Sequence, residues 1–150
     1  MAELPEMLRR RESFCAWARV SVRYNDLDPL GHVNNAAMAV YLEQARCELI
    51  TPLLKAERKS LDIVLAATSI SYLEELHYPG LVEVGTVARR IGSKSMSLEH
   101  GVFQNSRCAG VASVVLVTFD LETRTSVAVP ESVRALLATL GPRAEASAPR

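Results

Sequence analysis

The chain has 150 residues, 49% of them hydrophobic and 23% charged, a composition typical of one globular domain. Its 17 basic and 17 acidic residues cancel, which argues against nucleic acid or an anionic membrane surface as a partner. No apolar run reaches the ~18 residues of a membrane helix, and no secretory leader is evident. The three cysteines, Cys15, Cys47 and Cys108, are too widely spaced for a disulfide framework or a zinc site. We therefore expect a cytoplasmic protein.

The chain opens with a polar segment and then a strand. Residues 1–12 hold little that could be buried, so we expect a solvated N-terminal arm there. From Ser13 to Arg23, apolar and polar side chains alternate, which predicts a strand with one face on a core. Turn-forming residues at 25–26 and 29–31 end that strand.

A long helix follows the turn. Asn34 or Asn35 can serve as its N-cap. From Ala37 to Leu53 apolar residues recur every three or four positions, and several of them are small, as suits a helix lying close to a sheet. Pro52 and the charged run after it predict the end of this helix.

The rest of the chain predicts sheet. Four strand-like segments are separated by turns rich in Gly, Pro, Asn and Ser. Pro130 then opens a short amphipathic helix. The strands are expected at 63–72, 81–91, 96–104 and 111–121, the helix at 131–140, and a disordered tail at 141–150.

This order predicts a single α+β domain over residues 13–140, in which a five-stranded, mostly antiparallel sheet packs on one long helix, with a short C-terminal helix added. The helix covers only one face of the sheet. The other face and the edges need a cover, which favours a homodimer or homotetramer.

The segment from strand to helix resembles the hotdog-fold acyl-CoA thioesterases of the 4-hydroxybenzoyl-CoA thioesterase family. The resemblance implies a sheet wrapped around the long central helix, and the element order agrees over about residues 13–140. The residues that carry it are Tyr24, Asp26, Asp28, Gly31, His32, Val33, Asn34, Asn35, Tyr41, Leu42, Glu43, Ala45 and Arg46.

The resemblance implies that Asp28 is the catalytic carboxylate. A carboxylate just before a helix start is favoured as an anion by the helix dipole. It could attack a thioester carbonyl directly or activate a water. In the family, backbone N–H groups at the helix start polarise the carbonyl, which corresponds to about Asn34 and Asn35 here. Because no side chain is needed for that role, replacing Asn35 should have a modest effect.

The evidence for a functional role is weaker for the other residues of this segment. We interpret Asp26 as a turn cap. His32 could transfer a proton, although positioning the loop or Asp28 is the simpler role. Tyr24 could orient the Asp28 loop or line the pocket, or it could simply pack at the strand end. The remaining candidates, for substrate contacts, are Gly31, Val33 and Asn34.

Two positions depart from the family pattern. Some members carry a histidine where this chain has Asn35, so a histidine-assisted scheme cannot be transferred to that position. Met38 stands where an aromatic residue is common, which changes the local shape of the pocket. Glu43 could be a buried acid, but an ion pair with Arg46 on the helix is the preferred interpretation.

The sequence thus predicts an enzyme that hydrolyses acyl-CoA to a free acid and coenzyme A, with an acyl-CoA as small-molecule substrate. It predicts no metal site and no cofactor beyond the coenzyme A of the substrate. Two alternatives stay open: a thioesterase acting on acyl-acyl-carrier protein, and a hotdog module that binds acyl-CoA without turnover. Any of Arg89, Arg90, Lys94 and Arg107 could meet a nucleotide phosphate, and all could equally be solvated surface.

Overall fold

The computed structural model describes residues 4–141. Five long strands form one antiparallel sheet in the order β1-β3-β4-β5-β2, and the two-residue β6 pairs with β5. The strands are β1 (Ala16–Ser21), β2 (Leu61–Tyr72), β3 (Leu81–Ile91), β4 (Ser95–Gln104), β5 (Arg107–Asp120) and β6 (Thr125–Ser126).

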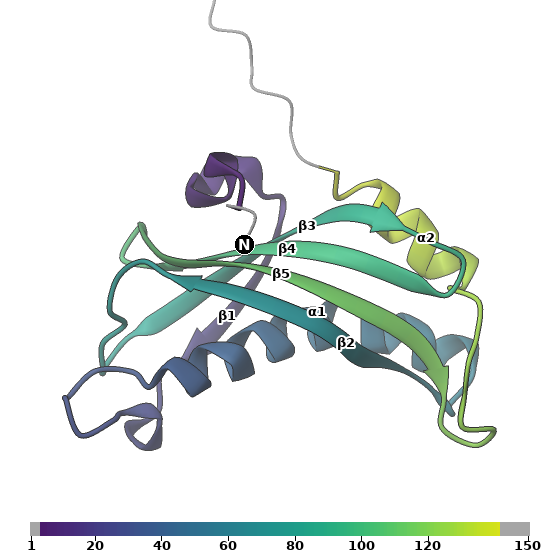
Figure 1. Ribbon diagram of the computed structural model, residues 1–150, viewed down its shortest axis with the longest axis horizontal. Coiled ribbons are helices and arrows are strands. Elements are labelled where there is room, and N and C mark those ends of the chain that lie inside the picture. The colour runs from purple at the N-terminus through teal and green to yellow at the C-terminus, as the bar shows by residue number, and fades with distance from the viewer. Residues whose placement is uncertain (1–3, 142–150) are drawn as a thin grey trace, which may run out of the picture.

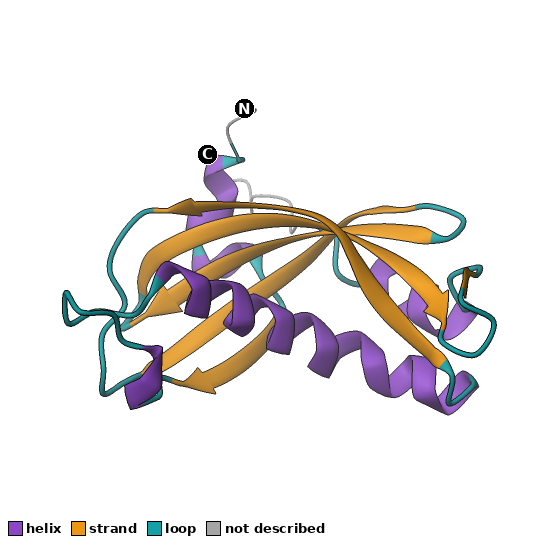
Figure 2. Cartoon of the chain, turned by 60° about the horizontal axis from the view of Figure 1, so that its bottom comes forward, coloured by secondary structure: helices purple, strands orange, loops and turns teal. Residues whose placement is uncertain are grey.

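The sheet curls around the long helix α1 (Asn35–Glu57), which crosses its concave face (Figures 1 and 2). The short helix α2 (Glu131–Ala138) lies at the other end of the molecule from the start of α1 (Figure 1). This is the hotdog arrangement expected from the resemblance, and the α+β prediction is confirmed. Of the tail predicted at 141–150, residues 142–150 lie outside the described residues.

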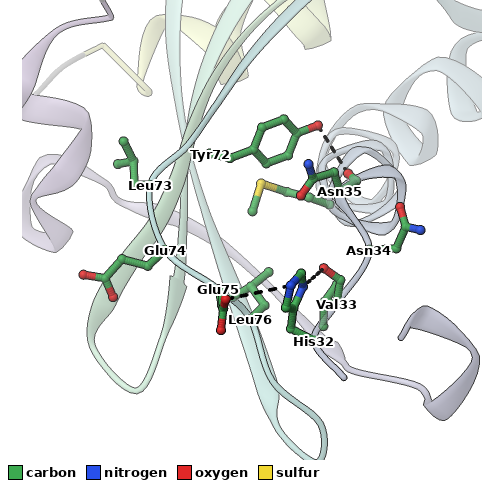
Figure 3. A pocket seen from close by; sticks show the side chains of 10 residues that line it. His32, Val33, Asn34, Asn35, Tyr72, Leu73, Glu74, Glu75 and Leu76 are labelled. Carbon is green, nitrogen blue, oxygen red and sulfur yellow. Dashed lines mark hydrogen bonds and ion pairs between the residues drawn. The ribbon is translucent and has the colours of Figure 1, made fainter. Parts of the chain in front are cut away.

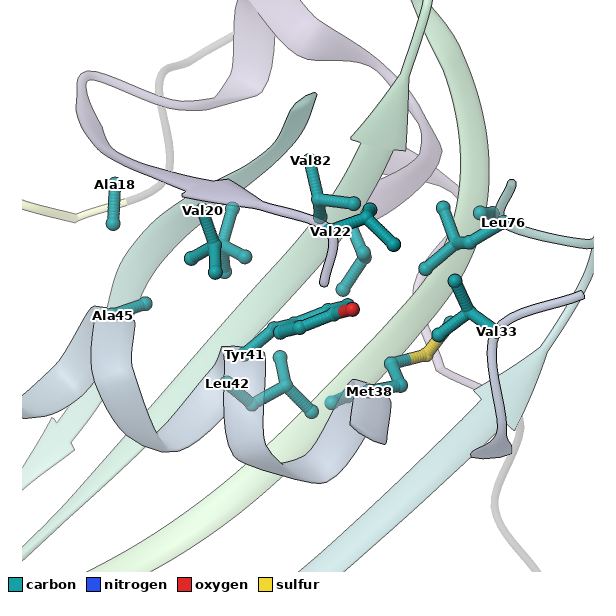
Figure 4. Packing of buried hydrophobic residues seen from close by; sticks show 14 residues of the cluster. Ala18, Val20, Val22, Val33, Met38, Tyr41, Leu42, Ala45, Leu76 and Val82 are labelled. Carbon is teal, nitrogen blue, oxygen red and sulfur yellow. The ribbon is translucent and has the colours of Figure 1, made fainter. Parts of the chain in front are cut away.

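The core lies between α1 and the concave face of the sheet. Alternate residues of β1, β3 and β4 point toward the helix and meet its buried face (Figure 4). In the half of the core nearest the helix start, the helix contributes Met38, Tyr41, Leu42 and Ala45, and the sheet contributes Val20, Val82, Val84 and Val102.

The helix does not end at Pro52, which corrects the sequence-based expectation. Pro52 lies inside α1, and the helix continues to Glu57. The last turn is held by buried Leu54, whose carbonyl accepts a hydrogen bond from the Arg58 N–H. Tertiary burial of this turn outweighs the one backbone hydrogen bond that a proline removes.

The N-terminal segment is not a solvated arm. It forms two short 3₁₀ turns, Glu6–Arg9 and Arg11–Ser13, and its Leu8 and Phe14 are buried on the convex face of the sheet. Room for Phe14 comes from Gly85 and Gly101, which face each other across β3 and β4. A Cβ atom at either glycine would overlap the Phe14 ring.

The same segment is also held by a cation. The Arg11 guanidinium lies 4.4 Å from the centre of the Trp17 ring and 3.0 Å from a carboxylate oxygen of Glu83 on β3. The domain therefore begins well before the Ser13 boundary expected from the sequence.

Candidate active site

The loop that joins β1 to α1 carries most of the predicted site residues. It contains a 3₁₀ turn, Tyr24–Asp26, and is closed by an isolated bridge between Leu27 and Val33. Inside this closure the Asp28 N–H donates to the His32 carbonyl oxygen, and the Gly31 N–H donates to the Asp28 carbonyl oxygen. Gly31 has a φ of +84°, a left-handed conformation that glycine adopts without strain.

Asp26 is a structural residue, as the turn-cap interpretation predicted. Only 4% of Asp26 is exposed. Its carboxylate accepts hydrogen bonds from the Arg23 N–H and side chain and, at 2.6 Å, from the Tyr41 hydroxyl of α1. Burial alone would raise the pKa of Asp26, but these hydrogen bonds outweigh it and hold the pKa below its ordinary value. The loop is thereby tied to the helix.

Asp28 is held differently. Its Oδ1 accepts a hydrogen bond from the Leu30 N–H, and its Oδ2 lies 3.4 Å from Nδ1 of His32. Its side chain keeps 16% of its surface exposed. The fold therefore brings Asp28 and His32 together, and it leaves one carboxylate oxygen without a backbone donor among the described residues.

A pocket of about 200 Å³ lies at the start of α1, beside this pair. We call it the helix-start pocket; Figure 3 shows the side chains that line it. One wall is the end of the β1–α1 loop and the first turn of α1. The other wall is the end of β2 and the connection that follows it. The lining residues are His32, Val33, Asn34, Asn35, Met38, Tyr72, Leu73, Glu74, Glu75 and Leu76.

The helix start leaves one backbone donor free at this pocket. Asn34 is the N-cap, and its side-chain oxygen accepts a hydrogen bond from the Ala36 N–H. The Asn34 carbonyl oxygen accepts from the Ala37 N–H. The Asn35 N–H has no acceptor among residues 4–141, so it can donate to a bound group.

His32 lies between two carboxylates. Its Nδ1 faces Asp28, and its Nε2 lies 3.8 Å from a carboxylate oxygen of Glu75, across the pocket (Figure 3). Its Nδ1 also lies 3.4 Å from the Val33 carbonyl oxygen. These contacts fit a residue that positions Asp28 and can pass a proton between the loop and the pocket.

The structure places the remaining candidates as follows. Val33, Asn34 and Asn35 line the pocket, whereas Asp28 lies just behind His32 and Gly31 lies in the loop outside it. Tyr24 is 72% exposed, and its ring packs edge-on against Tyr78 instead of entering the pocket.

Sequence reasoning missed the second wall of the pocket. Tyr72 donates a hydrogen bond to the Asn35 carbonyl oxygen, and Glu74, Glu75 and Leu76 follow it. Only the pairing of β2 with β5 brings this segment to the helix start, and no local pattern marks it.

The described residues hold neither a metal-like cluster nor a membrane-like helix. Within residues 4–141, no three His, Cys, Asp or Glu side chains are grouped as metal ligands would be. In the same range, no helix is long and apolar enough to cross a membrane. Cys15, Cys47 and Cys108 are free thiols.

Comparisons with known proteins identify the family and agree with the fold. Residues 22–137 match the family model described as the Thioesterase-like superfamily. A thioesterase from Thermus thermophilus, solved in complex with coenzyme A and Zn, is 35% identical, with a TM-score of 0.72 over 86% of this chain and 96% of that one. The PA5185 protein of Pseudomonas aeruginosa strain PAO1 is 25% identical, with a TM-score of 0.82 over 91% of this chain and 99% of that one.

One sequence relative matches over a shorter stretch. The uncharacterised protein YsmA of Bacillus subtilis (strain 168) is 28% identical over 91 residues. That match covers 60% of this chain and 62% of the length of YsmA.

Proposed function

Because the chain belongs to the thioesterase-like superfamily, we propose that it hydrolyses acyl-CoA thioesters to a free acid and coenzyme A at the helix-start pocket. The observation that carries the proposal is the free Asn35 N–H at this pocket, with the Asp28–His32 pair beside it. A thioester carbonyl needs a donor for its developing negative charge and a carboxylate within reach of its carbon.

In this proposal the thioester oxygen accepts a hydrogen bond from the Asn35 N–H. The positive end of α1 stabilises the oxyanion as the carbonyl carbon becomes tetrahedral. Tyr72 holds the Asn35 carbonyl from the opposite wall and so fixes the first turn of the helix. The C–S bond then breaks, and the coenzyme A sulfur leaves as a thiolate and takes up a proton.

Asp28 supplies the attacking group in one of two ways. Its Oδ2 attacks the carbonyl carbon to give a mixed anhydride that water then cleaves, or it takes a proton from a water that attacks directly. Single turnover in ¹⁸O-labelled water, with enzyme in excess, identifies the anhydride route when label appears in the protein; label in the product acid alone fits either route. When water cleaves the anhydride at the Asp28 carboxyl carbon, the first product acid takes its oxygen from Asp28 and the label enters the protein. A general base puts the label in the product acid at once.

Coenzyme A is the proposed carrier because the Thermus thermophilus thioesterase, 35% identical, was solved with coenzyme A bound. A panel of acyl-CoA esters with detection of free thiol tests the activity itself. Matched acyl-CoA and acyl-carrier-protein substrates test the carrier. Calorimetric binding of acyl-CoA without release of thiol would instead favour a binding module.

We further propose that the active form contains a second copy of the chain at the β2 edge, in a homodimer or a homotetramer of such dimers. β2 has 12 residues, and Val64 and Leu65 in its middle are exposed. The other edge strand, β1, has six residues. A long strand with apolar side chains and unpaired backbone groups is the better template for pairing. Because β2 also carries Tyr72, a partner there would help to close the pocket.

Light scattering on the purified protein tests this assembly. Leu65→Lys should shift the protein toward monomer and lower its activity. Leu121→Lys, at an equally exposed leucine just after β5, should change neither.

A further inference from the structure

The helix-start pocket has a polar mouth and an apolar floor. Most of its lining residues are at least partly exposed, and they include the two acids Glu74 and Glu75. Three are buried, with 2% to 5% of their surface exposed: Val33, Met38 and Leu76. The same three belong to the core cluster between α1 and the sheet (Figure 4). The pocket therefore runs inward from a polar mouth to a floor that is part of the core.

This gradient gives a bound thioester one orientation. Asn35 begins α1 and is exposed, so its free N–H lies at the mouth of the pocket. A thioester whose oxygen accepts that N–H keeps its large polar coenzyme A in water. Its acyl chain then meets the floor, because apolar carbons gain free energy where they leave water.

The three floor residues differ in how firmly they are held. The Val33 N–H donates to the Leu76 carbonyl oxygen at 2.8 Å, which fixes these two branched side chains through their backbones. Met38 is unbranched and has three rotatable side-chain bonds, so it is the adaptable part of the floor. It lies on the core-facing side of α1 and packs within its own chain. A second copy at the β2 edge is therefore not needed to complete the floor.

The end of the Met38 side chain occupies space that Gly110 leaves open. Gly110 is a buried residue of β5 and pairs with Tyr72 of β2, which also lines the pocket. A Cβ atom at Gly110 would lie 2.8 Å from Sδ of Met38 and 3.1 Å from its Cε. The thioether thus rests against bare backbone of β5, and Gly110 decides how far Met38 withdraws from the pocket.

We infer that Met38 sets the acyl-chain length of the substrate, because the chain ends against its side chain. This inference rests on the proposed thioesterase function and names the residue that determines its acyl specificity. Each chain carbon that reaches the floor adds affinity by leaving water. A longer chain must push Met38 out of a packed core, and such overpacking is unfavourable.

The test is a series of straight-chain esters from acetyl-CoA to dodecanoyl-CoA, with kcat/KM measured from thiol release. In the wild-type protein kcat/KM should rise about fourfold per added carbon to a peak and then fall. Met38→Ala removes Cγ, Sδ and Cε and so makes room for about three more carbons. The peak should move by that amount, and the ester at the new peak should gain about tenfold or more over its wild-type value. Met38→Leu, of similar volume, should keep the peak within about one carbon.

Gly110→Ala should act in the opposite direction. Its Cβ displaces Sδ of Met38 toward the pocket, so the peak should move to chains shorter by about one or two carbons. This variant also covers the case in which Met38→Ala fails to fold. The matched control is Met96→Ala, at a methionine that is 1% exposed in the other half of the core. It opens a comparable cavity away from the pocket and should leave the peak unmoved.

A shift in the stated direction in either Met38→Ala or Gly110→Ala, absent from Met96→Ala, supports the inference. An unmoved peak in both variants, an equal shift in Met96→Ala, or a wild-type kcat/KM that rises through dodecanoyl-CoA without a peak would overturn it alone. Absence of thiol release from every ester would overturn the proposed function. In that event calorimetric binding of the same ester series still decides the inference, because the length limit concerns binding and not the cleavage step.

Discussion

Asp26 and Asp28 lie two residues apart in one loop, yet their carboxylates have opposite surroundings. Asp26 is buried, and both of its oxygens accept hydrogen bonds from Arg23 or Tyr41. Asp28 is half-buried, with one oxygen held by the Leu30 N–H and the other facing His32. A carboxylate whose acceptor capacity is filled holds the structure together, whereas one with an oxygen to spare can react. The contrast gives the first residue a structural role and supports the catalytic role proposed for the second.

The strongest test of this contrast is Asp28→Asn. The amide oxygen can still accept the Leu30 N–H, but it can neither attack a carbonyl nor take a proton. Thiol release should fall by about 10²–10⁴-fold, and the free energy of unfolding in urea should stay within about 0.5 kcal/mol. Undiminished hydrolysis would contradict the proposed catalytic role of Asp28.

Asp26→Ala should show the reverse behaviour. It leaves the Tyr41 hydroxyl and the Arg23 N–H without their acceptor at a buried position, which should cost about 2–4 kcal/mol of unfolding free energy. Tyr41→Phe, which removes one of these bonds, should cost less. Activity per folded molecule should survive in Tyr41→Phe; if it is lost there at full folding, Asp26 is not purely structural.

The comparison must be made at neutral pH because another buried group responds to acid. Burial, and to a lesser extent the charge of Arg46, lowers the pKa of His100 from 6.5 to about 3. The unfolded chain then binds a proton more readily than the folded one, so stability is full above pH 6.5 and is lost as the pH falls below it. Between pH 7 and pH 5 the loss attributable to His100 should be about 2 kcal/mol.

Urea unfolding at the two pH values measures this loss, and His100→Gln, which does not titrate, is the control. If the unfolding free energy of the wild type changes with pH as much as that of the variant, His100 is not the source of the loss. The comparison of the Asp26 variants at a single pH is unaffected by the titration of His100.

The smallest expected effects concern the helix start. Asn34→Ala removes the N-cap bond to the Ala36 N–H and should cost about 1 kcal/mol of stability. Asn35→Ala keeps the backbone N–H, so kcat should change by less than about threefold. A large loss of kcat in Asn35→Ala with intact folding would show that the Asn35 side chain, and not its backbone N–H, donates to the thioester oxygen. It would also weaken the case that Asp28 is the only side chain needed for catalysis.

The sequence predicted the parts of the fold that depend on local patterns. The alternation before Arg23 marks β1 because its two faces meet different surroundings, and Asp28 and His32 meet because they lie four residues apart in one closed loop. What could not be predicted depends on distant partners. Burial of Phe14 needs Gly85 and Gly101, about seventy residues and more away, and the Glu75 wall of the pocket reaches the helix start only once β2 has paired.

The space that Gly85 and Gly101 leave for Phe14 also limits how whole molecules can associate. Two sheets that stack face to face lie about 10 Å apart, with interlocking side chains between them. Over this part of the convex face that layer is already filled by Leu8 and Phe14 of the same chain. A neighbouring sheet could stack there only if residues 4–14 detached. The N-terminal segment therefore acts as a built-in spacer over this part of the convex face.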